Sequence, residues 1–178
     1  HRRGQRSSAG LPLPSGPFQR MKRFSSGDLR QLRDTAAASP RLRSHLNWHD
    51  PLHDPVQRFW IQLHPGTYVR PHRHIQQQRL ETTVLIAGHA ELLLFDDHGQ
   101  LLDRLQLAEG GLRAVELSPD QWHSYIALAP TTLFEVKQGP YEASADKQFA
   151  DWAPAENTAS VTGFLQRMKT LTVGETLR

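Results

Sequence analysis

The chain of 178 residues lacks cysteine and any long apolar run. The absence of cysteine excludes disulfides, thiolate metal sites and cysteine nucleophiles, and it fits a reducing compartment. The longest apolar stretches, such as 84–87 and 92–95, are far shorter than the roughly 20 residues that a transmembrane helix needs. We therefore expect a cytoplasmic protein without membrane contact, of a size typical of one domain.

Acidic residues are scarce at the N-terminal end, and this scarcity explains the net charge of +3. Residues 1–33 hold eight basic residues against one acidic residue, whereas the rest of the chain holds 13 basic and 17 acidic residues. The excess positive charge thus belongs to a terminal segment and not to a surface of the body. We therefore expect no nucleic-acid partner.

The composition divides the chain into three parts. Residues 1–20 are rich in Gly, Pro, Ser and Arg without any period, and Met21 directly precedes a helix-start pattern. We expect 1–24 to be a disordered leader or tag, with Met21 as the true start. Residues 25–156 are expected to form one domain, and 157–178 a C-terminal amphipathic helix.

Periodicity indicates helices at both ends of an otherwise β-rich chain. Asp28 is expected to cap a helix that ends at Ser39-Pro40. Between the helices, short apolar or β-branched runs are separated by turn signals such as 96–99 and 109–111. Eight short strands without intervening helices predict an all-β antiparallel jelly-roll sandwich or barrel. The expected strands are 59–63, 67–74, 81–87, 90–95, 101–107, 112–117, 122–128 and 131–137.

Histidines with strand spacing are the strongest functional signal. His72 and His74 are two residues apart, so in a strand both imidazoles point to the same face. Glu81 opens the next strand, and His123 in a late strand could add a third nitrogen. This donor set suits one divalent transition metal ion, such as Fe, Mn, Ni, Co or Zn. The alternative is a chance pair, because ten histidines produce His-x-His spacings fairly often.

The same residues resemble the first motif of the cupin superfamily, Gly-x5-His-x-His-x3–4-Glu-x6-Gly. Gly66, His72, His74, Glu81 and Gly88 match it, except that six residues separate the second histidine from the glutamate. The second motif is matched loosely by 118–123, with an aspartate in place of a glycine. The resemblance implies a cupin jelly-roll β-barrel whose metal is held by the three histidines and the glutamate.

A longer resemblance, from about 29 to 156, is to the WbuC-type cupin-fold metalloproteins of bacterial surface-polysaccharide gene clusters. It implies a metal-bearing barrel, but it assigns no reaction. Together with exposed strands it favours a homodimer. The matching segments are 36–43, 47–49, 56–58, 65–74, 134–141, 146–147 and 152–156.

Several polar residues are candidates for binding or catalysis near this metal. Arg70 would alternate with the two histidines along one strand and face an anionic partner, either a substrate group or the carboxylate of Glu135 or Glu81. Glu135 and Lys137 share one strand face; they are candidate catalytic residues if that face is the barrel interior, and an ordinary exposed pair if it is not. Four further residues are candidates for binding substrate at the pocket, with loop hydrogen bonding as the alternative for the first three: His49, Gln57, Arg58 and Tyr125.

These features predict a metal-dependent enzyme acting on a small polar metabolite, such as a sugar or nucleotide-sugar, by metal-assisted proton transfer. Two other hypotheses remain open. One is an iron-dependent dioxygenase, and the other is a non-enzymatic sugar-binding or regulatory metalloprotein.

Overall fold

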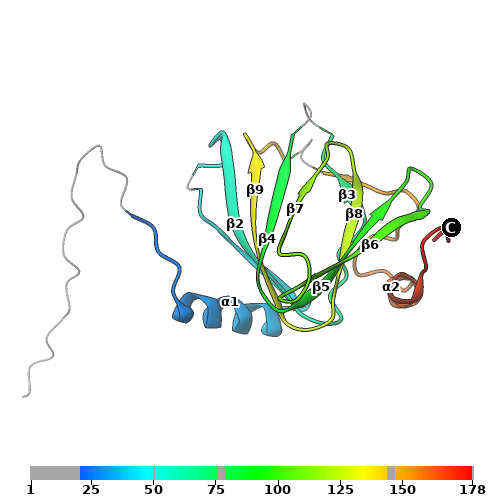
Figure 1. The fold of residues 1–178 in the computed structure, drawn as a ribbon, viewed down its shortest axis with the longest axis horizontal. Coiled ribbons are helices and arrows are strands. Elements are labelled where there is room, and N and C mark those ends of the chain that lie inside the picture. The colour runs from blue at the N-terminus through cyan, green and yellow to red at the C-terminus, as the bar shows by residue number, and fades with distance from the viewer. Residues whose placement is uncertain (1–20, 50, 76–78, 144–146, 178) are drawn as a thin grey trace, which may run out of the picture.

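Two antiparallel five-stranded sheets face each other, with one helix at each end of the molecule (Figure 1). The computed structural model describes residues 21–49, 51–75, 79–143 and 147–177, so most of the expected leader (1–20) and Asp146 lie outside the described residues. The first sheet has the order β1-β2-β9-β4-β7 and the second β10-β3-β8-β5-β6. The strands are β1 (Arg43–Asn47), β2 (Val56–Leu63), β3 (His72–Arg73), β4 (Glu81–Ala87), β5 (His89–Phe95), β6 (Leu101–Ala108), β7 (Ala114–Leu117), β8 (Trp122–Ala127), β9 (Thr131–Gln138) and β10 (Gln148–Phe149).

The predicted strands are confirmed with shifted ends, apart from one. The segment expected as strand 67–74 pairs only over His72–Arg73, and two edge strands, β1 and β10, were not predicted. Both are short or largely exposed, so they lack the apolar alternation by which a strand is recognised. No helix in the described part of the chain is long and apolar enough to cross a bilayer.

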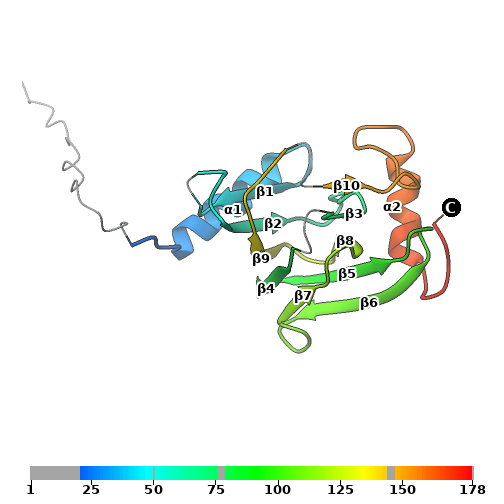
Figure 2. The same cartoon turned by 90° about the horizontal axis from the view of Figure 1, so that it is seen from above.

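Helix α1 (Ser26–Ala38) lies against β1 and β2 on the outside of the first sheet (Figure 2). Its N-cap is Ser25, and the prediction that Asp28 caps it was wrong. Asp28 occupies the third helical position and accepts the backbone N–H of Ser25 at 2.6 Å, which completes a capping box. The helix ends before Ser39, as predicted. Phe24, the last residue of the expected leader, stacks on Trp60 with ring centroids 3.7 Å apart.

Helix α2 (Val161–Thr170) lies at the opposite end of the molecule and covers the outer face of the second sheet (Figures 1 and 2). It confirms the amphipathic helix expected within 157–178. Because neighbours on a strand alternate between faces, Trp122 and Ile126 of β8 point outward to this helix. They form one core cluster with buried residues of α2: Phe164, Leu165 and Met168.

The barrel interior changes from apolar to charged along the strands. On the inner face of β9, Leu133 is followed by Glu135 and Lys137, so the core lies around Leu133 and the charged groups lie toward one end of the barrel. The apolar end requires a glycine at position 88, with φ +101°, because a Cβ atom there would lie 2.3 Å from the carbonyl oxygen of Pro130. Eight buried residues make the inner core: Leu63, Leu85, Leu92, Leu107, Leu117, Tyr125, Ala127 and Leu133.

Candidate metal centre and cavity

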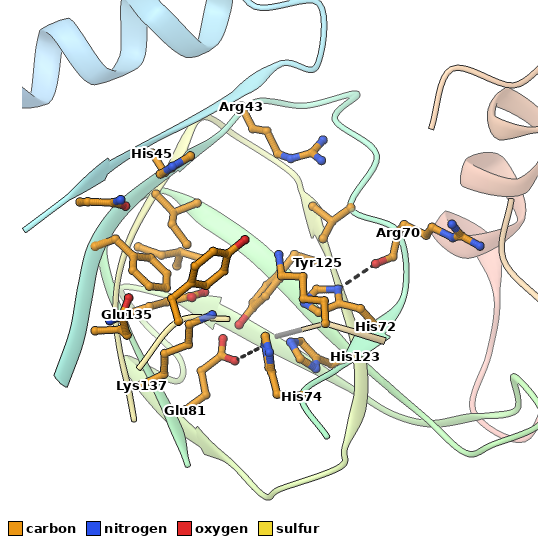
Figure 3. Close-up of a pocket in the computed structure, with 18 of the residues that line it drawn as sticks. Arg43, His45, Arg70, His72, His74, Glu81, His123, Tyr125, Glu135 and Lys137 are labelled. Atoms are coloured by element: carbon orange, nitrogen blue, oxygen red, sulfur yellow. Dashed lines mark hydrogen bonds and ion pairs between the residues drawn. The ribbon is translucent and has the colours of Figure 1, made fainter. Parts of the chain in front are cut away.

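Three imidazoles, from β3, the residue that follows it and β8, meet inside the barrel (Figure 3). Pairing of β3 with β8 sets His72 directly opposite His123, with ring centroids 4.4 Å apart. His74 follows two residues later, with its ring centroid 5.5 Å from that of His72 and 5.9 Å from that of His123. One nitrogen from each ring lies within 4.8 Å of the other two. This geometry agrees with the prediction that His123 meets the earlier histidine pair, although His72 and His123 are 51 positions apart in the chain.

Backbone carbonyls orient two of these rings. Nδ1 of His72 lies 2.8 Å from the carbonyl oxygen of Arg70, and Nδ1 of His123 lies 2.9 Å from that of Gln121. Each Nδ1–H therefore donates to a carbonyl, which leaves Nε2 with its lone pair, as is usual for metal-binding histidines. Nε2 of His123 is buried and has no hydrogen-bond partner among the described residues. A bound cation would satisfy it.

Glu81 lies beside the triad despite the longer spacing in the sequence. Its Oε2 is 2.8 Å from Nε2 of His74, and its side chain is buried. Two donor atoms at adjacent octahedral positions, each about 2.1 Å from an ion, are about 3 Å apart. Burial by itself would raise the pKa of Glu81, but the adjacent imidazole of His74 and the proximity of His123 bring it below its ordinary value. An ionised carboxylate is thus in place for a fourth ligand.

The donor set fits a divalent transition metal ion. Burial lowers the pKa of His72 and of His123, so both imidazoles are neutral at neutral pH, which is the form that binds metals. Three imidazole nitrogens with one carboxylate oxygen suit Fe, Mn, Co, Ni or Zn more than Ca or Mg, which prefer oxygen ligands. Four protein ligands on an octahedral ion would leave two positions for water or substrate.

A cavity of about 580 Å³ opens over this centre. Its volume lies within the range of small-molecule sites. Sheet register places the polar end of both sheets around it, and the C-terminal segment after β9 closes one side. The residues predicted for the site that line it are Arg70, His72, His74, Glu81, His123, Glu135, Lys137, His49, Gln57 and Tyr125.

The face of β9 that carries Glu135 and Lys137 is the barrel interior, which decides the alternative that the sequence left open. Lys137 is the direct neighbour of Glu81 across the β4–β9 pair, and its Nζ lies 5.3 Å from the ring centroid of Phe59. Burial, followed by the negative charge of Glu81, raises the pKa of Glu135 well above its ordinary value. Phe134, which directly precedes Glu135 and points to the outer face, packs instead against Trp60.

Tyr125 lies on the inner face of β8, two residues after His123. Its hydroxyl oxygen is 3.4 Å from Oγ1 of Thr83, on the facing sheet. Burial raises the pKa of Tyr125 well above its ordinary value, so it remains a phenol. The hydroxyl is therefore a neutral hydrogen-bonding group in the wall of the cavity.

The candidates of the entry segment separate onto two faces. Gln57 and Arg58 are neighbours on β2, so only one of them can face inward. Gln57 does, although its amide donates to the carbonyls of Leu52 and Asp54 at 3.0 and 2.8 Å. Arg58 points away, and its guanidinium pairs with Asp54 at 3.0 Å, which corrects its expected place at the pocket mouth. The backbone N–H of Arg58 lies 2.9 Å from Nδ1 of the buried His49.

Arg70 does not alternate with the two histidines as predicted, because 67–71 is not a strand. Its guanidinium turns toward the C-terminal segment, as Figure 3 shows. There it donates to the carbonyls of Ala153 and Ala150 at 3.0 and 3.2 Å and lies 5.0 Å from the ring centroid of Phe149. These contacts replace the expected pairing with Glu135 or Glu81. Arg70 contributes to the centre mainly through the carbonyl that holds His72.

Sequence reasoning missed a basic group in the cavity wall. This group consists of four side chains that line the cavity. Arg43 and His45 lie on β1, Arg41 lies two residues before Arg43, and Lys147 directly precedes β10. Glu156, more than 100 residues away, pairs with both arginines. The alternation Arg-x-Arg-x-His over 41–45 is the only sequence signal that could have indicated a common face.

Comparison with known proteins identifies the fold. A family model described as "Domain of unknown function (DUF6016)" matches residues 24–107, and no curated protein matches the chain. Similar structures include CapF bound to 3-isopropenyl-tropolone (15% identity, 63% of this chain and 33% of that one, TM-score 0.52). Another is salicylate 1,2-dioxygenase from Pseudaminobacter salicylatoxidans (10% identity, 66% and 34%, TM-score 0.50). A third is a cupin superfamily protein from Desulfitobacterium hafniense (10% identity, 54% and 76%, TM-score 0.43).

The chain thus spans about a third of the length of each of the first two proteins. At these identities the likeness concerns the fold alone. The predicted fold class is confirmed: the chain is an all-β jelly-roll barrel with an N-terminal and a C-terminal helix.

Proposed function

We propose that this cupin barrel is a metal-dependent enzyme that acts on a small polar metabolite by metal-assisted proton transfer. The observation that carries the proposal is the meeting of His72, His74 and His123 in a cavity of about 580 Å³, where Nε2 of His123 has no hydrogen-bond partner within the described part of the chain. A structural histidine cluster would satisfy its buried nitrogens internally. A binding site for a metal ion leaves them directed at the ion.

In this proposal His72, His74 and His123 hold the ion, and Glu81 is the fourth ligand. The ion, when bound, supplies Lewis-acid polarisation of a substrate carbonyl or hydroxyl group. Glu135 and Lys137 are the groups that move protons, because both point into the cavity beside Glu81. A proton donor or acceptor must lie within reach of the substrate atom, and residues two apart on one strand meet this condition together.

The substrate is proposed to be a sugar or nucleotide-sugar of bacterial surface-polysaccharide metabolism. The resemblance to WbuC-type proteins supports this choice, and so does the mixed lining of the cavity. Tyr125, Gln57 and His49 offer hydroxyl, amide and imidazole groups, which are the partners that sugar hydroxyls bind. We also propose a homodimer, which light scattering of the purified protein would test.

Metal content is the first test of this function. Protein purified without an affinity tag should contain close to one equivalent of a transition metal by ICP-MS. The double variant His72→Ala/His74→Ala should lose the metal and keep the β-sheet circular dichroism signal. His98→Ala is the matched control, because His98 is an exposed residue of the β5–β6 turn. A double variant that retains a full equivalent would disprove the ligand assignment.

Activity then separates the candidate reactions. Lys137→Met should abolish turnover of a sugar substrate while metal content stays near one equivalent. Bound iron with substrate-dependent oxygen uptake would instead favour the dioxygenase. Full metal occupancy and stoichiometric sugar binding without turnover would favour the non-enzymatic, sugar-binding role.

A further inference from the structure

One wall of the cavity is basic, and it lies apart from the proposed proton-transfer pair. Arg43 and His45 are two residues apart on β1 and share its inner face. In Figure 3 they lie across the cavity from Glu81 and Lys137. Lys147, which precedes β10, lines the same cavity.

The ion pairs of the two arginines leave an excess of positive charge in this wall. Arg41 and Arg43 both bind Glu156, so two guanidinium groups share one carboxylate. Oε1 of Glu156 accepts a hydrogen bond from Nη2 of Arg41 at 2.8 Å and another from Nη2 of Arg43. Arg43 is held further by donating to the carbonyl of Tyr68 at 3.0 Å. Its side chain is only 17% exposed, so its charge acts in a poorly solvated place.

The positive charge of this wall shifts the pKa of a histidine within it. The pKa of His45 lies below its ordinary value, first because of partial burial and then because of the positive charges of Lys147, Arg41 and Arg43. The basic wall and the histidine triad line the same cavity. A ligand that touches the triad can therefore also contact the positively charged side chains of the wall.

We propose that Arg43, His45 and Lys147 form an anion subsite that binds a carboxylate or phosphate group of the substrate, while the rest of the substrate lies against the histidine triad. This inference rests on the proposed function, and it narrows the substrate class to acidic or phosphorylated small molecules. Arg43 is held in place by Glu156, whereas Lys147 is an exposed side chain at the edge of the cavity. Such a division of roles suits a guanidinium and an ammonium group.

Anion binding by the full-length, metal-loaded protein tests the subsite. Isothermal titration calorimetry with inorganic phosphate and with acetate, at constant pH and ionic strength, would measure the affinity and stoichiometry. One site per chain is expected for at least one of the two anions, and the tighter ligand identifies the preferred group. Lys147→Met should weaken that binding about tenfold or more, since it removes a charged hydrogen-bond donor. Lys147→Arg should retain it.

Lys169→Met is the matched control, because it removes the same charge from an exposed position on α2, outside the cavity. Its affinity should equal that of the wild type. Equal weakening of anion binding by Lys169→Met and Lys147→Met would overturn the subsite. An undiminished affinity of Lys147→Met would also overturn it, because the anion would then bind at the metal or elsewhere. If neither phosphate nor acetate binds to protein that holds a full equivalent of metal, the subsite is overturned, whereas the proposed function is not.

Discussion

The pairing of Glu156 with two arginines predicts a pH-dependent loss of stability in the variant Glu156→Gln. Glutamine keeps the shape and one carbonyl oxygen, so the change removes mainly the negative charge. Arg41 donates to Glu156 from Nε and Nη2 at 2.9 and 2.8 Å, but its side chain is 55% exposed and contributes little. Arg43 is 17% exposed, so most of the loss comes from leaving its charge unpaired.

The expected cost at pH 7 is about 1 to 2 kcal/mol, which combines one well-shielded charged hydrogen bond with a weaker exposed pair. For a domain of this size that cost corresponds to a decrease in melting temperature of about 2 to 8 °C. Burial would raise the pKa of Glu156, but the hydrogen bonds from Arg41 and Arg43 lower it below its ordinary value. A lowered pKa stabilises the fold above the unfolded-state pKa, and this contribution is lost as pH falls through the folded-state pKa.

Urea denaturation followed by tryptophan fluorescence at pH 7 and at about pH 3 would measure the effect. The gap between wild type and Glu156→Gln should be largest at pH 7 and should shrink as the pH falls and Glu156 takes up a proton. Glu109→Gln, at an exposed turn position, is the control and should show no comparable gap. A gap below about 0.5 kcal/mol at pH 7, or one of equal size at both pH values, would refute the reasoning.

Two further predictions concern packing. Met168→Ala should reduce the free energy of unfolding by about 2 to 5 kcal/mol, because Met168 is fully buried between α2 and the second sheet; Met21→Ala, at a position 73% exposed, should leave urea denaturation unchanged. Gly88→Ala should cost more than about 1 kcal/mol, because its φ is +101° and its Cβ would lie 2.3 Å from a backbone oxygen, whereas Gly110→Ala has open space for the added methyl group. Equal melting temperatures within either pair would contradict the argument.

Local chemistry made much of this protein predictable. Short apolar or β-branched runs between turn signals identified most of the barrel strands, and helical spacing identified α2, because both patterns depend only on the sequence of one element. His72 and His74 could be paired because two residues along a strand share a face. Even where the strand proved shorter than expected, that local rule was sufficient.

The way in which strands, helices and loops contact one another could not be predicted from such local patterns. Alternation states that Gln57 and Arg58 face opposite sides, but it does not state which side is inside. Arg70 turned away because the segment before β3 leaves the sheet, and its donors found carbonyls of the C-terminal segment. Asp28 was wrongly predicted as the cap because the cap depends on where the helix begins, and the helix begins at Ser26, directly after Ser25.

The sequence by itself thus determined which segments form strands or helices, that His72 and His74 point to the same side, and which residues of a strand share a face. Only the tertiary structure decided which face closes around the cavity, that His123 lies opposite His72, and that Glu156 joins Arg41 and Arg43 in its wall. The physical reason is that barrel closure and strand register are collective: they are set by the burial of the whole inner core, and no single segment carries that information.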